Sequence, residues 1–447
     1  MLKLFDYSSL SKETSKKYGA VAFQLARKLF PICRSITGPG LRESLNHLKR
    51  INPNMEILNI PTGSKVFDWT VPDEWSIRAA YIIDPSGKKI VDFEECNLHV
   101  IGYSHPVDME ISLDELLPHL HSLPEQPNAI PYVTSYYKKR WGFCMTEEMK
   151  NSLKPGKYKV YIDSNLYKGN LSYAELLIPS TEAKSNKTIF FSTYICHPSM
   201  ANNELSGPVT ATAIAHYLSS LSYRRYNYRF VFVPETIGSI AYISKNLKLL
   251  KEEVIAGFNI TCVGDERNYS FLPSRKGQTL ADKSLTTILS HYADKYKTYE
   301  WSSRGSDERQ YCWPGVDLPI ASFMKTKYGE YPEYHTSLDQ LGTVVTEKGL
   351  ASSFDVMMKN IELLENNYYF KSTVLCEPQL SSRDLYQDLS IKTTYSNQNV
   401  YLEILTHCDG ESTFIDIINK IKMPPWEMYP KIKDLIEKGL VTVAAES

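Results

Sequence analysis

Apolar strand patterns alternate with helical patterns through much of the chain, from about residue 188 to residue 365. The apolar runs are TIFFSTYI, RFVFVP, VIAGFNIT and LPIASF, and a segment with helical spacing of its apolar residues follows each of them. Strands that are apolar along their whole length are buried on both faces, and helices between such strands are the usual crossovers of a parallel sheet. The alternation therefore predicts an α/β fold with a mostly parallel sheet that is flanked by helices.

A different sequence pattern in residues 57–127 predicts a second domain. This stretch has short β-rich runs, a Pro-Ser-Gly turn at 85–87 and little helical pattern before SLDELLPHLHSL. We interpret it as a small β-rich domain inserted into the α/β domain, which would then consist of residues 1–56 and 128–370. The segments KYKVYIDS and LSYAELLIP follow the insertion and are expected to be strands that return to the main sheet.

The pattern changes again after Cys376. Residues 377–447 show three short helical segments and a closing strand, with Pro425 in the first turn of the third helix and Gly439 after its end. This order is typical of a winged-helix domain. Its third helical segment, KMPPWEMYPKIKDLIEKG, has four lysines and three acidic residues. We therefore expect contacts with a protein partner or with a second copy of the chain rather than with nucleic acid.

The overall charge and the cysteine pattern limit the classes of protein. The 447 residues carry 50 basic and 51 acidic side chains, and a net charge of -1 excludes a global field that attracts nucleic acid or an acidic membrane. No apolar run reaches the ~20 residues of a membrane span, and the first residues lack the apolar stretch of a signal peptide. Eight cysteines occur without any CxxC pair. We expect a cytoplasmic protein with reduced thiols and no membrane contact.

Three segments carry side chains that could meet at one edge of the sheet. His197 follows the run TIFFSTYI, and Glu235 follows the run RFVFVP. Ligands of an open α/β sheet bind outside the carboxyl ends of its strands, so both side chains have a physical reason to be functional. His335 lies in the polar segment EYHTSLD. Two imidazoles and a carboxylate around an open position are the ingredients of a catalytic zinc site.

Other acidic residues near these segments have competing interpretations. Glu204 precedes LSG at a helix start, where it could bind a metal or favour the helix N-terminus electrostatically. Asp265 follows the end of a strand and could be a metal ligand or a turn residue. Asp339 could orient His335 or cap the following turn. Asp307 is better interpreted as part of the loop structure or as a residue that positions substrate.

The order of these segments resembles the family of zinc aminopeptidases and carboxypeptidases that includes glutamate carboxypeptidase. The matching pieces are His197, NELSG (203–207), PET (234–236), NITCVG (259–264), SD (306–307) before GVDLP (315–319), and YHTSLD (334–339). The whole chain, with DWTVPDEW and SYYKKRWGFC, is also similar to bacterial aminopeptidase-like proteins that have an inserted β domain and a C-terminal winged helix. The resemblance implies a zinc exopeptidase-like fold and a hydrolytic activity with Glu235 as general base.

The chain departs from the family pattern at three ligand positions. Asn203 stands where the family has its metal-bridging Asp, Thr236 where a second Glu binds the second zinc, and Thr261 where a strand Asp binds the first zinc. The resemblance therefore implies one zinc ion per chain. The remaining candidate ligands are His197, Glu204 and His335, completed by Asp265.

These observations lead to one leading hypothesis and two alternatives. The leading hypothesis is a zinc-dependent hydrolase of the aminopeptidase or exopeptidase type, in which Glu235 activates water for attack on an amide bond next to a small polar or amino end group. A peptide, an acylated amino sugar or an amidated cell-envelope precursor would fit as substrate. The alternatives are a catalytically inactive descendant that binds a ligand, and a ligand-sensing regulator that uses the winged helix.

Overall fold

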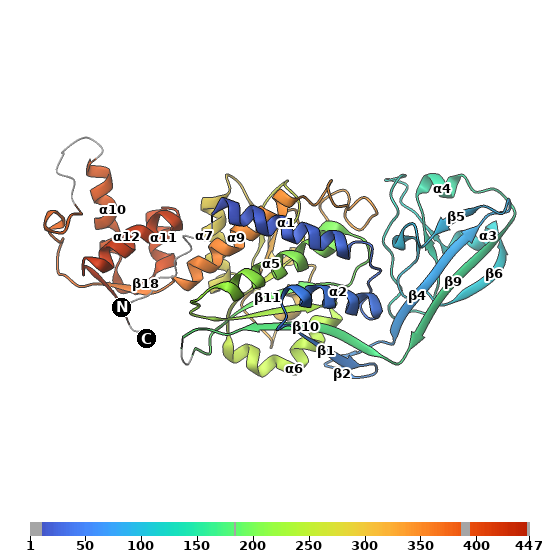
Figure 1. Ribbon diagram of the computed structural model, residues 1–447, viewed down its shortest axis with the longest axis horizontal. Helices are drawn as coiled ribbons and strands as arrows, with labels where there is room; N and C mark the ends of the chain where they lie inside the picture. The colour runs from blue at the N-terminus through green and yellow to red at the C-terminus, as the bar shows by residue number, and fades with distance from the viewer. Residues whose placement is uncertain (1–10, 183–184, 386–393, 445–447) are drawn as a thin grey trace.

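The protein has three parts in a row along its longest axis (Figure 1). The structure is a computed structural model that describes residues 11–182, 185–385 and 394–444. A central α/β part lies between the C-terminal helices at one end and a β-rich part at the other, which contains β4 (Glu74–Ile83) and β9 (Lys157–Tyr167). The fold class predicted from the sequence is confirmed.

The central part is built on an eight-stranded sheet with the order β1-β10-β12-β11-β13-β16-β14-β15. The middle strands β12, β11, β13 and β16 are parallel to one another, whereas antiparallel pairing adds β10 and β1 on one side and β14 on the other. The strand bounds are β1 Glu56–Pro61, β10 Asn170–Ile178, β11 Thr188–Tyr194, β12 Asn227–Val233, β13 Val254–Ile260, β14 Ser270–Leu272, β15 Lys297–Thr298 and β16 Ile320–Met324. The parallel middle of the sheet carries the predicted alternation.

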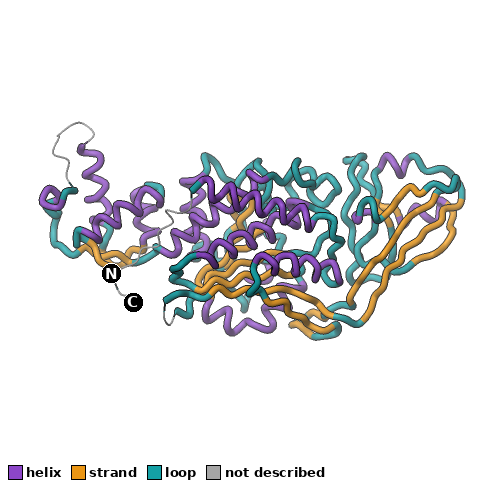
Figure 2. The backbone as a smooth tube through the Cα atoms, viewed as in Figure 1, coloured by secondary structure: helices purple, strands orange, loops and turns teal. Residues whose placement is uncertain are grey.

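Helices cover both faces of this sheet (Figure 2). Along β11, Phe191 packs into the core beneath α1, α5 and α9, and Phe190 packs into the core beneath α6, because successive side chains of a strand point to opposite faces. The helix bounds are α1 Lys12–Leu29, α2 Pro39–Ile51, α5 Ser206–Ser220, α6 Ile237–Glu253, α7 Leu280–Tyr292, α8 Glu308–Tyr311 and α9 Glu347–Glu365. The two-sided burial explains why the middle strands have continuous apolar sequences.

The β-rich part is larger than the sequence predicts. Its main sheet has the order β5-β4-β9-β6, with β5 at Lys89–Asp92 and β6 at Val107–Ser112. The expectation that KYKVYIDS returns to the main sheet is wrong, because this segment forms β9 and pairs with β4 and β6. Its side chains alternate between buried and exposed, which suits a sheet that is covered on one face only. The segment LSYAELLIP does return, as β10.

Short elements complete the β-rich part and its junction with the centre. They are β2 Lys65–Val66, β3 Trp69–Thr70, η1 Asn97–His99, α3 Leu113–Leu116, η2 Leu117–His119, β7 Leu120–His121, β8 Phe143–Cys144 and α4 Glu147–Asn151. In sequence the β2–β3 hairpin lies between β1 and β4, and the loop at 130–140 lies between β7 and β8; both supply side chains to the pocket described below.

The C-terminal unit has the winged-helix elements that the sequence predicts. They are β17 Tyr369–Ser372, η5 Leu380–Arg383, α10 Thr394–Thr406, β18 Asp409–Thr413, α11 Phe414–Ile421, α12 Pro425–Glu437 and β19 Val441–Val443. Pro425 does stand in the first turn of α12, and Gly439 follows it with a φ of 70°. The sheet order β18-β17-β19 places β17 in the middle, so the unit begins at residue 369 rather than at 377. Its core is continuous with the core of the central part.

Two further properties concern the part of the chain that the structure describes. None of the helices in the described part of the chain is both long and apolar enough to cross a lipid bilayer. All eight cysteines are free thiols, and Cys376 alone among them is exposed.

Candidate metal centre

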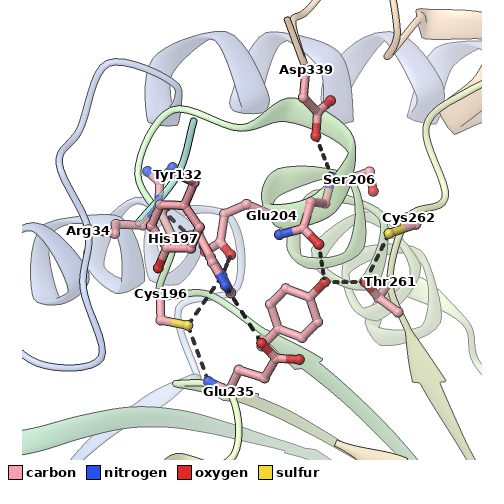
Figure 3. Close-up of polar contacts among 12 residues, drawn as sticks. Arg34, Tyr132, Cys196, His197, Glu204, Ser206, Glu235, Thr261, Cys262 and Asp339 are labelled. Carbon is pink, nitrogen blue, oxygen red and sulfur yellow. Dashed lines mark hydrogen bonds and ion pairs between the residues drawn. The ribbon is translucent and has the colours of Figure 1, made fainter. Parts of the chain in front are cut away.

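His197 lies just beyond the end of β11, with its ring almost completely buried (Figure 3). Its Nδ1 is 2.7 Å from Oε2 of Glu204 and 3.4 Å from Sγ of Cys196. Burial opposes the charged ring, but the neighbouring Cys196 and Glu204 raise the pKa of His197 well above its usual value. A histidine whose Nδ1 is hydrogen-bonded to a carboxylate presents Nε2 to a ligand. The ring is therefore fixed with Nε2 directed away from Glu204.

Glu204 lies in a π-helical turn, Ala201–Leu205, that leads into α5. The carboxylate of Asp339 holds this turn, because it accepts hydrogen bonds from the backbone N–H groups of Asn202 at 2.8 Å and Asn203 at 2.9 Å. A separation of 2.7 Å between Glu204 and His197 is that of a hydrogen bond, shorter than the roughly 3.3 Å between two ligands of a tetrahedral zinc. In this arrangement Glu204 orients the ring of His197 through that hydrogen bond.

Arg34 completes a buried chain of contacts behind His197, and sequence reasoning missed it. Its Nε donates to the backbone oxygen of His197 at 2.9 Å and lies 3.6 Å from Oε1 of Glu204. Its Nη1 donates to the backbone oxygen of Leu29, and the side chain is completely buried. A buried carboxylate needs such a partner to stay charged. In the sequence, Arg34 occupies the break PICRSITG between two helices, which looks like an ordinary loop.

Glu235 follows β12 and faces the other nitrogen of the same imidazole. Its Oε2 is 3.6 Å from Nε2 of His197, and its side chain is 24% exposed. Its backbone N–H donates to Sγ of Cys196 at 3.2 Å. Burial raises the pKa of Glu235, while the charge of His197 acts in the opposite direction. A carboxylate with a raised pKa beside a histidine is suited to accept a proton from water.

His335 is the second imidazole at this site. Its ring centroid is 5.6 Å from that of His197, and Tyr334 stacks on it at 3.9 Å. Its φ of 56° is a left-handed conformation that is uncommon outside glycine. The backbone N–H of Tyr132 donates to its carbonyl oxygen at 2.8 Å. Burial, and then the charge of His197, lower the pKa of His335 to about 3. His335 is therefore a neutral imidazole, the form that binds a metal.

Asp265, Asp307 and Asp339 form hydrogen bonds with other groups of the protein. Asp265 accepts hydrogen bonds from the side chain of Asn202, from the backbone N–H of Arg267, and from the backbone N–H and hydroxyl of Thr326. Both of its oxygens are thus occupied, so it anchors loops and is not positioned to complete a metal site.

Asp307 and Asp339 likewise anchor the backbone. Asp307 accepts from the N–H of Thr236 and from the hydroxyl of Ser239, both at 2.8 Å. Asp339 neither orients His335 nor caps the following turn, because it holds the π-helical turn before α5. Both carboxylates support the segments that carry the candidate site.

The positions where the resembled family has further metal ligands are filled by hydrogen-bonded side chains. The phenol of Tyr194 donates to Oδ1 of Asn203 at 3.0 Å and accepts from the hydroxyl of Thr261 at 2.6 Å. Arg309 donates to the hydroxyl of Thr236 at 3.0 Å. These neutral groups and a guanidinium do not suit a second divalent cation. The arrangement supports the expectation of a single-metal site.

A metal ion would fit on the Nε2 side of His197. Among the described residues, Cys196, His197 and Glu204 form a cluster whose ligand atoms lie within 4.8 Å of one another. In that cluster Nδ1 is engaged by Glu204, and burial raises the pKa of Cys196 to about 11, which keeps a protonated thiol there. On the other side, Nε2 of His197 faces Glu235, and His335 is near. The two imidazoles are nitrogen donors that suit zinc, and Glu235 lies beside them.

A pocket of about 320 Å³ opens in front of these groups. His197, Glu235 and His335 line it together with side chains from the β2–β3 hairpin and the loop at 130–140. The remaining lining residues are Ile36, Trp69, Tyr132, Thr134, Tyr136, Tyr137, Cys196, Thr236 and Ile237. Its volume is at the lower end of small-molecule sites, which are commonly ~300 to 1,000 Å³.

Comparisons with known proteins agree with this fold. Residues 23–367 match the family model described as "Domain of unknown function (DUF4910)", and residues 368–443 match a winged helix-turn-helix model. A relative from Clostridium acetobutylicum, described as a candidate polysaccharide biosynthesis protein with an aminopeptidase-like domain, is 40% identical over 92% of this chain and 93% of its own.

Solved structures are similar as well. A candidate peptidase from Clostridium acetobutylicum has a TM-score of 0.90 and 38% identity, with 97% of this chain and 98% of that one covered. A zinc aminopeptidase from Bacillus subtilis has a TM-score of 0.56 at 12% identity, covering 78% of this chain and 94% of that one. The second similarity concerns the fold alone.

Proposed function

Because the chain belongs to the DUF4910 family, whose model covers residues 23–367, and has the fold of a zinc aminopeptidase, we propose that it is a zinc-dependent amide hydrolase with one metal ion per chain. The observation that carries the proposal is the convergence of His197, Glu235 and His335 in the lining of one pocket. The Clostridium acetobutylicum relative, described as having an aminopeptidase-like domain, supports the same class of reaction.

Each residue of the site has a distinct role in the proposal. His197 and His335 would hold the zinc ion, and Glu204, supported by Arg34, fixes the ring of His197. A bound zinc ion lowers the pKa of a water molecule and polarises a carbonyl oxygen. Glu235 would accept a proton from water in the pocket and deliver it to the leaving nitrogen.

Under this proposal the substrate contains an amide bond, and two chemical classes of amide are candidates. The relative's description joins an aminopeptidase-like domain to polysaccharide biosynthesis. Amides of amino acids and amides of amino sugars are therefore the two classes that an activity assay should compare.

Substitution of Glu235 tests the proposal most directly. The full-length protein should contain about one zinc ion after growth with zinc, and it should hydrolyse a member of an amide panel that includes leucinamide and N-acetylglucosamine. Glu235→Gln should keep the zinc and lose ~10² to 10⁴ in kcat. Glu43→Gln, an exposed carboxylate on α2, is the control and should change neither property.

Two results would contradict the proposal in different ways. Absence of metal from the zinc-grown protein would favour a ligand-binding descendant of the enzyme family. Loss of zinc from Glu235→Gln would make Glu235 a ligand and remove it as the base.

A further inference from the structure

We propose that the substrate is an N-acylated amino sugar whose ring packs against Trp69 and Tyr137 at the mouth of the pocket. This inference rests on the proposed amide hydrolysis and specifies its substrate. In that reaction the oxygen of water bonds to the acyl carbon, the carbon–nitrogen bond breaks, and a proton of the water passes to the nitrogen. The products are a carboxylic acid and an amino sugar.

Trp69 and Tyr137 form an exposed aromatic pair at the pocket. Trp69 belongs to the β2–β3 hairpin and is 38% exposed, and Tyr137 belongs to the loop at 130–140 and is 58% exposed. Their ring centroids are 5.9 Å apart, with an interplanar angle of 65°. Large aromatic side chains left in solvent beside a pocket are typical of binding sites. The flat faces of such rings pack well against the C–H bonds of a pyranose.

Hydroxyl groups also line this pocket. The phenols of Tyr132 and Tyr136 are hydrogen-bonded to each other at 2.7 Å, and Thr134 lines the same pocket. The ring of Tyr132 contacts the rings of both His197 and His335, each at a centroid distance of 5.1 Å. The pocket thus combines aromatic faces with neutral hydroxyls, which suits a ligand that has C–H faces and several hydroxyl groups.

The charges around the pocket favour a neutral substrate. No lysine or arginine lines it among the residues that the structure describes, so a free carboxylate or phosphate on the part of the substrate away from His197 and the metal would find no cationic side chain there. Glu235 is the one carboxylate in that lining, and it faces Nε2 of His197. A free α-ammonium group would need a further carboxylate as its partner. An N-acylated amino sugar has neither a free carboxylate nor a free ammonium group, whereas an unblocked peptide has both.

A comparison of three acyl substrates tests the inference on the full-length zinc protein. N-acetylglucosamine and N-acetylethanolamine have the same acetamide, but only the first has a sugar ring. Leucinamide represents an aminopeptidase substrate. We expect kcat/KM for N-acetylglucosamine to exceed the values for the other two by at least about tenfold, the effect of one favourable aromatic contact.

Aromatic substitutions show whether the ring contact is the cause. Trp69→Ala and Tyr137→Ala should each lower kcat/KM for N-acetylglucosamine about tenfold and leave N-acetylethanolamine unchanged. Phe67→Ala is the matched control, because Phe67 is 57% exposed on the same hairpin and does not line the pocket. Equal losses in all three variants would overturn the proposal.

A binding measurement separates this inference from the proposed hydrolysis. Titration calorimetry with N-acetylglucosamine should show binding that Trp69→Ala weakens and Phe67→Ala does not. Such binding without hydrolysis of any amide would contradict the proposed function and support the sugar site. Hydrolysis of leucinamide in preference to N-acetylglucosamine would overturn the sugar site and leave the hydrolase assignment standing.

Discussion

Arg34 and Glu204 form a buried ion pair behind His197, and removing one member of such a pair leaves the other charge without compensation. Arg34→Met should therefore lower the free energy of unfolding by about 3–5 kcal/mol. Adding Glu204→Gln should recover part of that loss, because the stranded carboxylate is then gone. Urea denaturation of the two single variants and the double variant measures the coupling. Losses that simply add would show that the two side chains act independently.

The two histidines should control metal content. His197→Ala and His335→Ala should each reduce bound zinc from about one ion per chain to a small fraction, since two protein ligands cannot be reduced to one without large loss of affinity. Elemental analysis of the purified variants provides the measurement.

Asp265→Asn is the matched control for the histidine variants. It should retain zinc. The hydrogen bonds that the Asp265 carboxylate accepts lose a charged acceptor, so the free energy of unfolding should fall by about 1–3 kcal/mol. Zinc loss in this variant would restore Asp265 as a ligand.

Strand ends could be located from the sequence, but the partners of the side chains there could not. His197 and Glu235 were found because each follows an apolar run, and such ends meet at one edge of a parallel sheet. Asp265 satisfies the same rule, yet it is bonded to Asn202 and Thr326, which are distant in sequence. Arg34 is 163 residues from the histidine whose carbonyl it contacts. No local pattern encodes such a contact.

At the scale of elements, the spacing of apolar residues along a strand indicates which of the two sheets the strand joins better than its position along the chain does. The segment of β9 alternates, and it lies in the sheet that is covered on one face, although its neighbour β10 belongs to the main sheet. The π-helical turn before α5 has no comparable signal, because Asp339, which holds it, comes more than a hundred residues later. The resemblance located the turn but not its geometry.

The end of α9 gives a prediction for pH. Burial raises the pKa of Glu365 to about 7, although it accepts hydrogen bonds from the backbone of Arg225 and from the phenol of Tyr228. The usual value in an unfolded chain is about 4.3. Between these values the folded state holds a proton that the unfolded state has released, so the contribution of Glu365 to stability falls as pH rises.

Glu365→Gln cannot titrate, and it should isolate this contribution. The stability of the parent relative to the variant should decline between pH 4.5 and 7, by at most about 1.4 kcal/mol per pH unit. Urea denaturation at several pH values, with zinc content held constant, gives the difference. A constant difference across the window would contradict the assigned protonation.

Helix α12 gives a prediction about nucleic acid. In winged and other helix-turn-helix proteins, the N-terminal residues of the recognition helix contact base edges. Here Trp426, in the first turn of α12, lies under the ammonium of Lys359 on α9 at 4.8 Å, so that end of the helix packs against the central part. We expect no sequence-specific binding of duplex DNA by the full chain. Binding in a gel-shift assay that weakens steeply with salt would support the regulator alternative.

At the scale of the whole molecule, the central part supplies the candidate metal ligands, and the β2–β3 hairpin and the loop at 130–140 supply the aromatic wall of the pocket. Tyr132 links the two, because its backbone bonds to His335 while its ring contacts both imidazoles. The two proposals therefore place substrate recognition and hydrolysis in different regions of the chain. Composition and residue spacing could indicate the central part and the β-rich part. They could not indicate that Tyr132 contacts His197 and His335, because that contact depends on long-range packing.

The position of β17 in the middle of the winged-helix sheet determines where the chain can be shortened. A chain that ends at Cys376 keeps β17 but loses both of its partners, β18 and β19, and it uncovers Phe370, which is completely buried in the full chain. An unpaired strand with an exposed apolar side chain promotes aggregation.

A chain that ends at Asn367 lacks the whole three-stranded sheet and keeps the contact between Arg225 and the backbone of Asn367. We expect the chain ending at 367 to remain more soluble and to melt at a higher temperature than the chain ending at 376, with both below the full chain because they lose the contacts of α11 with α7. Size-exclusion chromatography and thermal unfolding compare the three proteins, and a higher melting temperature for the longer fragment would show that β17 belongs to the central part.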